Sequence, residues 1–113
     1  SYRQFGFGLM LVRLRESLEP IGTCGLINRE QLPDVDIGFA YLPEFRGQGY
    51  ASEAARAVLA YGKRQFGLSR IVAIVSPANA GSIRVLEKVG MTFERMIRLN
   101  ENDEVQLLAR EMD

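Results

Sequence analysis

The sequence contains no histidine and only one cysteine, Cys24. Without histidine, Ser-His-Asp and Cys-His nucleophilic mechanisms and histidine-ligated metal sites are excluded. One cysteine cannot form a disulfide within the chain, and we expect Cys24 to be a small core residue rather than an acyl carrier. Any chemistry of this chain therefore has to proceed without a histidine base or histidine ligands.

The chain also lacks an excess of either charge and any long apolar segment. Its 14 Lys and Arg residues balance 14 Asp and Glu residues, which argues against a nucleic-acid or membrane-surface partner. No apolar run reaches the roughly 18 residues of a membrane span. No signal peptide is visible, so a cytoplasmic location is expected. The 113 residues, 47% of them hydrophobic, fit one globular domain over residues 1–113.

The first third of the chain has the pattern of an antiparallel sheet. Residues 7–15 and 21–27 are apolar or alternating, and the short break at Pro20 predicts a β-hairpin. Residues 35–42 show the clearest alternation, with apolar side chains at every second position. The other face of that strand carries small residues and one carboxylate, namely Asp36, Gly38 and Ala40. Small residues there allow a ligand to approach the backbone closely.

The remainder of the chain mixes helical and strand patterns. We expect helices at 51–66 and 82–89 and strands at 71–75, 91–99 and 105–109. Because the first of these helices connects strand 35–42 to strand 71–75, the two strands should be parallel neighbours. The predicted fold class is α/β, with a mixed, mostly antiparallel sheet, a central parallel βαβ pair and flanking helices.

A glycine-rich segment lies between the strand at 35–42 and the helix at 51–66, with the sequence Arg46-Gly47-Gln48-Gly49-Tyr50-Ala51. The first N–H groups of a helix lack partners within it and attract anions. Gly47 and Gly49 allow the backbone to curve around an anion, and Arg46 adds a positive charge. The spacing matches neither the Walker A motif nor the Rossmann fingerprint. Alone, the segment fits a phosphate site and a tight turn before a helix equally well.

Several further motifs follow in one order over residues 35–95. They are Asp-Ile-Gly-Phe at 36–39, the glycine-rich segment at 46–51, Glu-Ala at 53–54, Asn79 with Ser82, and Val-Leu-Glu-Lys-Val-Gly at 85–90. Together they resemble the GNAT superfamily of acetyl-CoA-dependent N-acetyltransferases, and within it the RimJ/RimL-like branch that acetylates ribosomal-protein N-termini. The resemblance implies the GNAT fold, acetyl-CoA as co-substrate, no metal, and an amine on a small molecule or protein N-terminus as acceptor.

The resemblance assigns the coenzyme A site to two segments and one asparagine. The pyrophosphate would lie on the backbone N–H groups of Arg46, Gly47, Gln48, Gly49, Tyr50 and Ala51. The pantetheine arm would run beside the strand at Phe39, Ala40 and Tyr41, whose N–H groups would also polarise the acetyl carbonyl. Asn79 would contact the pantetheine, cap the second helix, or do both.

The resemblance also implies two catalytic residues for direct attack by a neutral amine in a ternary complex. Asp36 would accept a proton from the substrate ammonium directly or through water, and its short side chain favours the water relay; the alternative is a solvated carboxylate at a strand edge. Ser82 would help to protonate the leaving thiolate; the alternative is a first-turn serine that satisfies a backbone donor. Leu86 lies where many family members have a tyrosine acid, so Ser82, a water or the unaided thiolate must replace it.

The start of the chain departs from the family pattern. The family has a first strand and one or two helices before the hairpin, and these contribute to the acceptor site. We therefore expect an N-terminally truncated domain with an exposed sheet edge that could pair into a homodimer. Tyr2, Phe5 and Phe7 would line an acceptor pocket or belong to the core.

Two functional hypotheses remain. One is an N-acetyltransferase; the other is a non-catalytic acyl-CoA-binding or interaction module of the same fold. A nucleotide-phosphate binder unrelated to coenzyme A is weakly supported, because the sequence has no Mg²⁺-binding or base-binding signature.

Overall fold

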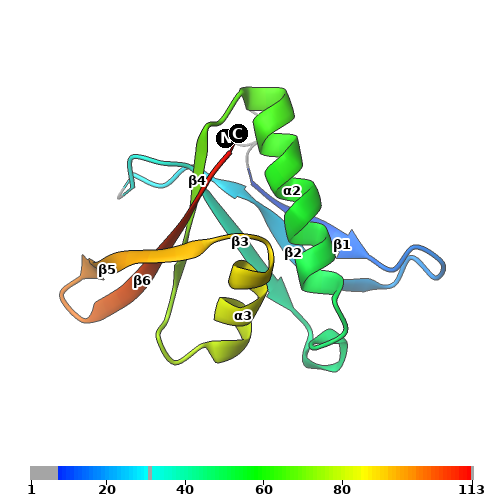
Figure 1. Cartoon of the computed structure of the whole chain (residues 1–113). Helices are drawn as coiled ribbons and strands as arrows, with labels where there is room; N and C mark the ends of the chain where they lie inside the picture. The colour runs from blue at the N-terminus through cyan, green and yellow to red at the C-terminus, as the bar shows by residue number, and fades with distance from the viewer. Residues whose placement is uncertain (1–7, 31, 113) are drawn as a thin grey trace.

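The computed structural model describes residues 8–30 and 32–112 of the chain. Its elements are β1 (Gly8–Arg13), β2 (Pro20–Ile27), β3 (Asp36–Tyr41), the 3-10 helix η1 (Pro43–Phe45), α2 (Tyr50–Phe66), β4 (Arg70–Val75), α3 (Ala80–Lys88), β5 (Thr92–Asn100) and β6 (Asp103–Glu111). Within these residues, the strands form one six-stranded sheet in the order β1-β2-β3-β4-β6-β5 (Figure 1).

This arrangement confirms the predicted order of strands and helices and the mixed α/β sheet. β3 and β4 are parallel, whereas every other neighbouring pair in the described sheet is antiparallel. Helix α3 begins at Ala80, two residues earlier than expected, because the Asn79 side chain accepts a hydrogen bond from the Ser82 N–H and caps the helix there. Helix α2 ends as predicted at Gly67, whose φ of 63° suits glycine.

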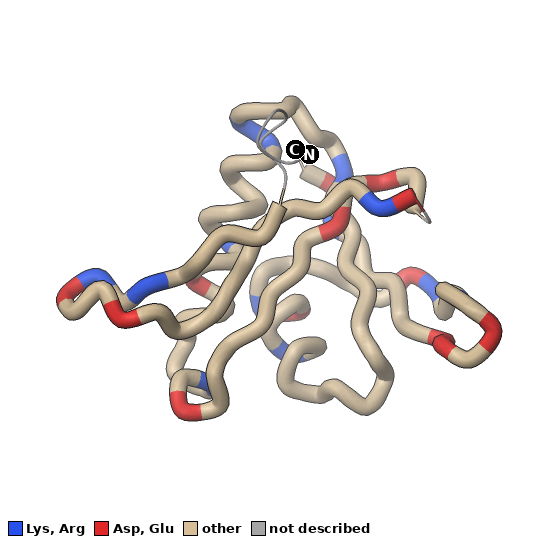
Figure 2. The backbone as a smooth tube through the Cα atoms, turned by 180° about the vertical axis from the view of Figure 1, so that it is seen from behind, with Lys and Arg blue, Asp and Glu red and all other residues tan. Residues whose placement is uncertain are grey.

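Both α-helices pack on one face of the sheet (Figure 1). The apolar stripe of α2 contributes Ala55 and Leu59, which are buried against Leu26 and Ile71 of the sheet. Cys24 belongs to the same core, as the sequence predicts. The view from behind shows the other face of the sheet, in front of which no described helix lies (Figure 2). A smaller buried cluster lies there, made of Leu32, Val72, Leu107 and Ala109.

The sheet divides at its centre, between β3 and β4. β2 pairs with β3 at every position from Asp36 to Tyr41, and β4 pairs with β6 along its whole length. Between β3 and β4, however, the described residues pair only at Asp36 and Val72, and the two strands then diverge (Figure 1). We call the space between the diverging strands the fork. Helix α3 follows β4 in the chain and lies near the end of the fork where the two strands are farthest apart (Figure 1).

Two further features bear on function. No helix in the described ranges is both long and apolar enough to cross a membrane. β1 and β5 form the two edges of the described sheet. Tyr2, Phe5 and Phe7 lie outside the described residues, so their predicted role in an acceptor pocket or core stays a prediction.

Candidate functional site

The glycine-rich segment forms a tight loop that leads directly into α2. Gly47 and Gly49 adopt left-handed conformations, with φ of 75° and 88°. L-amino acids with a Cβ rarely adopt such angles, which explains glycine at both positions. Gly49 is the N-cap of α2 and has no side chain to cap the helix.

The loop leaves a row of backbone donors unpaired. Among the described residues, no group accepts a hydrogen bond from the N–H groups of residues 47–52. The first internal bond of α2 runs from the Glu53 N–H to the Gly49 carbonyl oxygen, at 3.0 Å. The positive end of the helix dipole coincides with these donors. The loop therefore has the donors and the field that an anionic group requires.

A large cavity of about 1240 Å³ opens beside this loop. Nine of the twelve residues predicted for the site line it: Phe39, Ala40, Tyr41, Arg46, Gly47, Gly49, Ala51, Asn79 and Ser82. Gln48 and Tyr50 do not line it. The Gln48 side chain donates to the Glu44 carbonyl oxygen at 2.8 Å, and the Tyr50 ring contacts Phe45. Any contact of these two residues with a ligand would come from their backbone N–H groups.

Two cations that the sequence reasoning missed also line this large cavity. Arg84 and Lys88 lie one turn apart on α3, opposite the loop. Their spacing of four residues, which places them on one helix face, was the signal that could have found them. With Arg46, they bring the positively charged side chains that line the cavity to three, whereas Glu87 is its one negatively charged described lining residue.

The fork supplies a second set of unpaired backbone groups. The Leu42 N–H donates to the Ile21 carbonyl oxygen at 2.9 Å. Because neighbouring residues of an antiparallel strand alternate in direction, Ile37, Phe39 and Tyr41 direct their N–H and C=O groups away from β2 and toward β4. The parallel bridge between Asp36 and Val72 occupies the start of this edge, so the groups that face the fork are those of Phe39 and Tyr41. The Tyr41 carbonyl accepts a bond from Arg46 Nε at 3.0 Å. The rest of this edge is open to an extended ligand.

A smaller cavity of about 310 Å³ lies at the fork itself. It brings together the two predicted catalytic residues, since Asp36 and Ser82 both line it, together with Gly38 and Asn79. Asn79, Ser82, Phe39 and Ala40 line both cavities. The two cavities are therefore adjacent parts of one site.

Asp36 is not the solvated edge carboxylate that the sequence left as an alternative. It is 1% exposed, and Arg29 Nε donates to both of its carboxylate oxygens, at 3.0 and 3.2 Å. Burial raises the pKa of Asp36 above its ordinary value of 3.8, although the Arg29 charge and hydrogen bond act in the opposite direction. No sequence pattern indicated Arg29, because it lies on the loop before β3, where a lone arginine looks like a solvated surface residue.

The structure shows which of Asn79 and Ser82 caps α3 and which has a free side chain among the described residues. Asn79 Oδ1 accepts from the Ser82 N–H at 3.1 Å, so Asn79 is the helix cap. Within the described chain no group hydrogen-bonds to the Ser82 hydroxyl, so the alternative in which it satisfies a backbone donor is wrong. Leu86, which the resemblance matched with a tyrosine acid, is 2% exposed and lines the smaller cavity.

Two other ionisable side chains near the cavities stay uncharged. Burial raises the pKa of Cys24 to about 12, which keeps the thiol protonated and unreactive. Burial, together with Cys24 and Glu53, raises the pKa of Tyr41 to about 12. The buried Tyr41 hydroxyl has no hydrogen-bond partner among the described residues.

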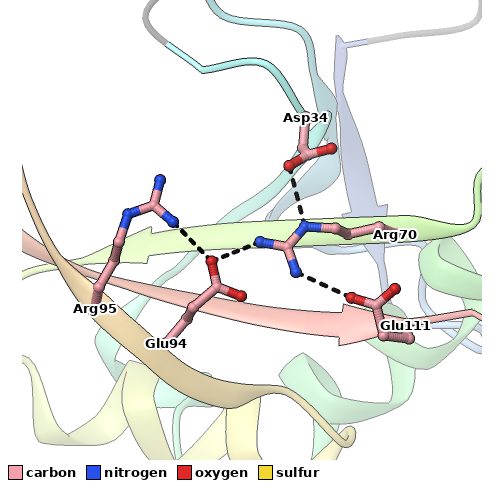
Figure 3. Close-up of polar contacts among 5 residues, drawn as sticks. All are labelled: Asp34, Arg70, Glu94, Arg95 and Glu111. Atoms are coloured by element: carbon pink, nitrogen blue, oxygen red, sulfur yellow. Dashed lines mark hydrogen bonds and ion pairs between the residues drawn. The ribbon is translucent and has the colours of Figure 1, made fainter.

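A separate cluster of charges lies outside both cavities. Arg70 contacts Asp34, Glu94 and Glu111 at 3.1, 2.7 and 2.9 Å, and Arg95 contacts Glu94 at 2.8 Å (Figure 3). The cluster joins the start of β4 to β5, β6 and the segment before β3. None of its five residues lines either cavity, so its contribution is to the attachment of neighbouring strands.

The family of the chain follows from comparison with known proteins. The acetyltransferase (GNAT) domain model matches residues 1–92, so the chain belongs to this family of acetyltransferases, whose acetyl donor is acetyl-CoA. It is similar to the uncharacterised N-acetyltransferase YnaD of Bacillus subtilis (strain 168), with 46% identity over 59 residues that make up 52% of this chain and 35% of that protein.

The fold of the chain is also found in solved acetyltransferases. An acetyltransferase from Agrobacterium tumefaciens str. C58 has a TM-score of 0.86 and 27% identity, over 98% of this chain and 64% of that one. RimL, a ribosomal L7/L12 alpha-N-protein acetyltransferase solved with coenzyme A, has a TM-score of 0.84 at 23% identity, over 99% of this chain and 66% of that one.

The chain is shorter than these proteins. It spans 56%, 35% and 50% of the first three curated relatives that it matches, or about half their length. Its own activity, acceptor and partners are therefore matters for proposal.

Proposed function

We propose that the chain transfers an acetyl group from acetyl-CoA to a primary amine in a ternary complex. The observation that carries the proposal is the row of unpaired N–H groups at residues 47–52, beside a cavity that continues into the fork. An elongated, anionic thioester fits such a path, because one end needs fixed positive donors and the rest needs an open strand edge.

In this proposal, the two ends of the co-substrate contact different parts of the chain. The loop at 46–51 binds the pyrophosphate through backbone N–H groups, and Arg84 and Lys88 offer charges to further phosphate. The edge of β3 at Phe39 and Tyr41 pairs with the extended pantetheine. Asn79 keeps its capping bond to Ser82 through Oδ1, while its Nδ2 group donates to the pantetheine.

The acetyl transfer itself is direct. Asp36, through a water, accepts a proton from the acceptor ammonium, and burial assists because it raises the pKa of this carboxyl. The neutral amine nitrogen then attacks the thioester carbonyl carbon, a C–N bond forms and the C–S bond breaks. N–H groups of the β3 edge stabilise the developing oxyanion. Ser82 Oγ, which has no competing partner in the described chain, donates a proton to the leaving sulfur. It takes up in its place, directly or through water, the proton that the attacking nitrogen loses as the amide forms.

A second candidate function is a non-catalytic acyl-CoA-binding module. The observation that favours it is Leu86, which occupies the position of the family's tyrosine and has no proton to give. Such a module would bind acyl-CoA through the loop at 46–51 as the enzyme does.

Four finer assignments stay predictions. The RimJ/RimL-like branch is one, because likeness to RimL at 23% identity shows the fold alone. The others are a single domain over residues 1–113, a homodimer formed through the exposed edge strand, and a cytoplasmic location.

The test is turnover of acetyl-CoA with a panel of primary amines, followed by mass spectrometry of the acetylated amine. The proposal predicts an acetylated product from the unaltered chain and strong loss of that product in Asp36→Asn. Arg98→Gln, an exposed change outside both cavities, should match the unaltered chain. Binding of acetyl-CoA with no acetylated amine would instead support the non-catalytic module.

A further inference from the structure

The smaller cavity contains a pair of opposite charges that differ in exposure. Its charged lining residues are Arg29 and Asp36. The Asp36 side chain is 1% exposed, whereas the Arg29 side chain is 36% exposed. The carboxylate is thus largely covered, and the guanidinium carries the charge that an incoming molecule meets first.

The way in which Arg29 binds Asp36 leaves most of its donors unused. Only Arg29 Nε contacts the carboxylate, and it donates to both oxygens, at 3.0 and 3.2 Å. A guanidinium has five N–H donors, of which four lie on the two terminal nitrogens. Across residues 8–30 and 32–112, no group accepts a hydrogen bond from Nη1 or Nη2 of Arg29.

Two adjacent terminal nitrogens of this kind are the standard geometry for a carboxylate. In a bidentate ion pair, two different nitrogens of the guanidinium would each donate to one oxygen of Asp36. Here Asp36 is satisfied by Nε alone, so a second carboxylate can bind the terminal nitrogens without displacing the first.

The rest of the cavity fits a small molecule better than a long cation. Its other lining residues are apolar or neutral, including Ile74, Thr23 and Ser76, and its volume is about 310 Å³. A second ammonium on the acceptor would face Arg29 in a cavity whose described lining has no carboxylate besides Asp36, and like charges repel. An acceptor with an amine at one end and a carboxylate a few bonds away would place opposite charges on Asp36 and Arg29.

We propose that Arg29 selects the acceptor, and that the acceptor is a small primary amine that carries a carboxylate, of the amino-acid type. The inference rests on the proposed acetyl transfer and names the acceptor class of the same site. Arg29 binds the carboxylate through Nη1 and Nη2, and the amine lies toward Asp36 and Ser82.

The test uses three acceptors of equal length: β-alanine, β-alaninamide and 1,3-diaminopropane. They differ in one end group, which is anionic, neutral or cationic. We expect kcat/KM to fall in that order, and Arg29→Lys to lower the ratio of β-alanine to β-alaninamide by about tenfold through KM. Comparing ratios between variants cancels the different basicity of the amines. The lysine of this variant retains a charge beside Asp36 but lacks the second nitrogen of the fork.

A binding measurement separates this inference from the proposed function. N-acetyl-β-alanine and its amide are titrated into the chain with coenzyme A, and the amide resonances of Gly38 and Ser82 are followed by NMR. The unaltered chain should bind the carboxylate form about tenfold more tightly, and the double variant Arg29→Gln with Asp36→Asn should bind both forms equally. That variant leaves the net charge unchanged and no buried charge unpaired.

The matched control is Arg98→Gln with Glu104→Gln, which removes an exposed pair with an N–O distance of 3.8 Å on β5 and β6. It should keep the preference for the carboxylate form. Equal binding of the two forms by the unaltered chain would overturn the inference whatever the turnover. Carboxylate-selective binding without any acetylated amine would show that Arg29 binds a carboxylate, but it would reject acetyl transfer and with it the assignment of an acceptor.

Discussion

The two cavities at the fork are built in different ways. The large cavity derives its character from the backbone: two left-handed glycines, unpaired N–H groups at 47–52 and the open edge of β3. The smaller cavity derives its character from side chains, chiefly the buried Asp36 and its partner Arg29. In the proposed reaction the first binds the co-substrate and the second the acceptor, so a substitution of Arg29 should alter the acceptor without altering the co-substrate.

This contrast predicts that damage to either cavity spares the other, and the largest effect is expected at the loop. Gly49→Glu places a carboxylate at the N-cap, where φ is 88°, and directs a negative charge at the phosphate site. We expect affinity for coenzyme A to fall by about 100-fold or more, because the change adds both backbone strain and charge repulsion. Isothermal titration calorimetry with coenzyme A measures this loss.

The matched control for this loop variant is Gly67→Glu. It introduces the same residue at a left-handed glycine, with φ of 63°, at the other end of the same helix. Its affinity for coenzyme A should match that of the unaltered chain. Equal losses in the two variants would show that a general distortion of α2, rather than the loop, is responsible.

The next largest effect is expected in the smaller cavity. Asp36→Asn removes the proton acceptor and should lower kcat/KM about 100-fold at neutral pH, within the usual range for a general base. Coenzyme A affinity should not change, since the loop is untouched. An equal loss of affinity would mean that the two cavities cannot be damaged independently.

The pH dependence sharpens the role of Asp36. Burial raises the pKa of Asp36 above the ordinary 3.8. The protonated form predominates below this raised pKa and cannot accept a proton from the ammonium. We therefore expect kcat/KM to fall, as the pH is lowered, at a pH above 3.8. The rate profile of Asp36→Asn should lack this acid limb, and an identical limb in both proteins would assign it to another group.

A smaller effect is expected at Ser82. Ser82→Ala removes the proposed proton donor to sulfur and should reduce kcat about tenfold, below the usual range for a general acid because a thiolate leaves readily. Asn79 caps α3 through the Ser82 backbone, so thermal stability should not change. Steady-state kinetics with a thermal melt measure both. An unchanged kcat would assign the proton to water.

The smallest effect is expected in the exposed cluster around Arg70, outside both cavities. Arg70→Met removes its contacts with Asp34, Glu94 and Glu111 (Figure 3). Surface ion pairs contribute little, so urea denaturation should show a loss of about 1 kcal/mol and turnover should stay the same. A change in KM for either substrate would connect this cluster to the site.

The same contrast explains which parts of the site the sequence could predict. A loop made of backbone groups has a local signature, because Gly47, Gly49 and the following helix are consecutive in the chain. The parallel pair of β3 and β4 was equally predictable, since a helix connects them. The partner of Asp36 was not, because seven positions and a loop separate it from Arg29, and the contact exists only once the strands are in place.

The roles of Asn79 and Ser82 could not be separated from the sequence, because both residues lie close to the start of α3. Asn79 and Ser82 could both cap α3, and the choice of Asn79 freed the serine hydroxyl for the cavity. The spacing of Arg84 and Lys88 on one helix face could be read from the sequence, but that they line the same cavity as the glycine-rich loop is visible only in the structure.

The most direct test of the two-cavity account is an NMR titration of the ¹⁵N-labelled chain with coenzyme A. The account predicts the largest shifts at the amides of residues 47–52, smaller shifts at Phe39 and Tyr41, and almost none at Arg70 or Glu94. Saturable shifts confined to the sheet face opposite the helices, with the loop unmoved, would contradict it.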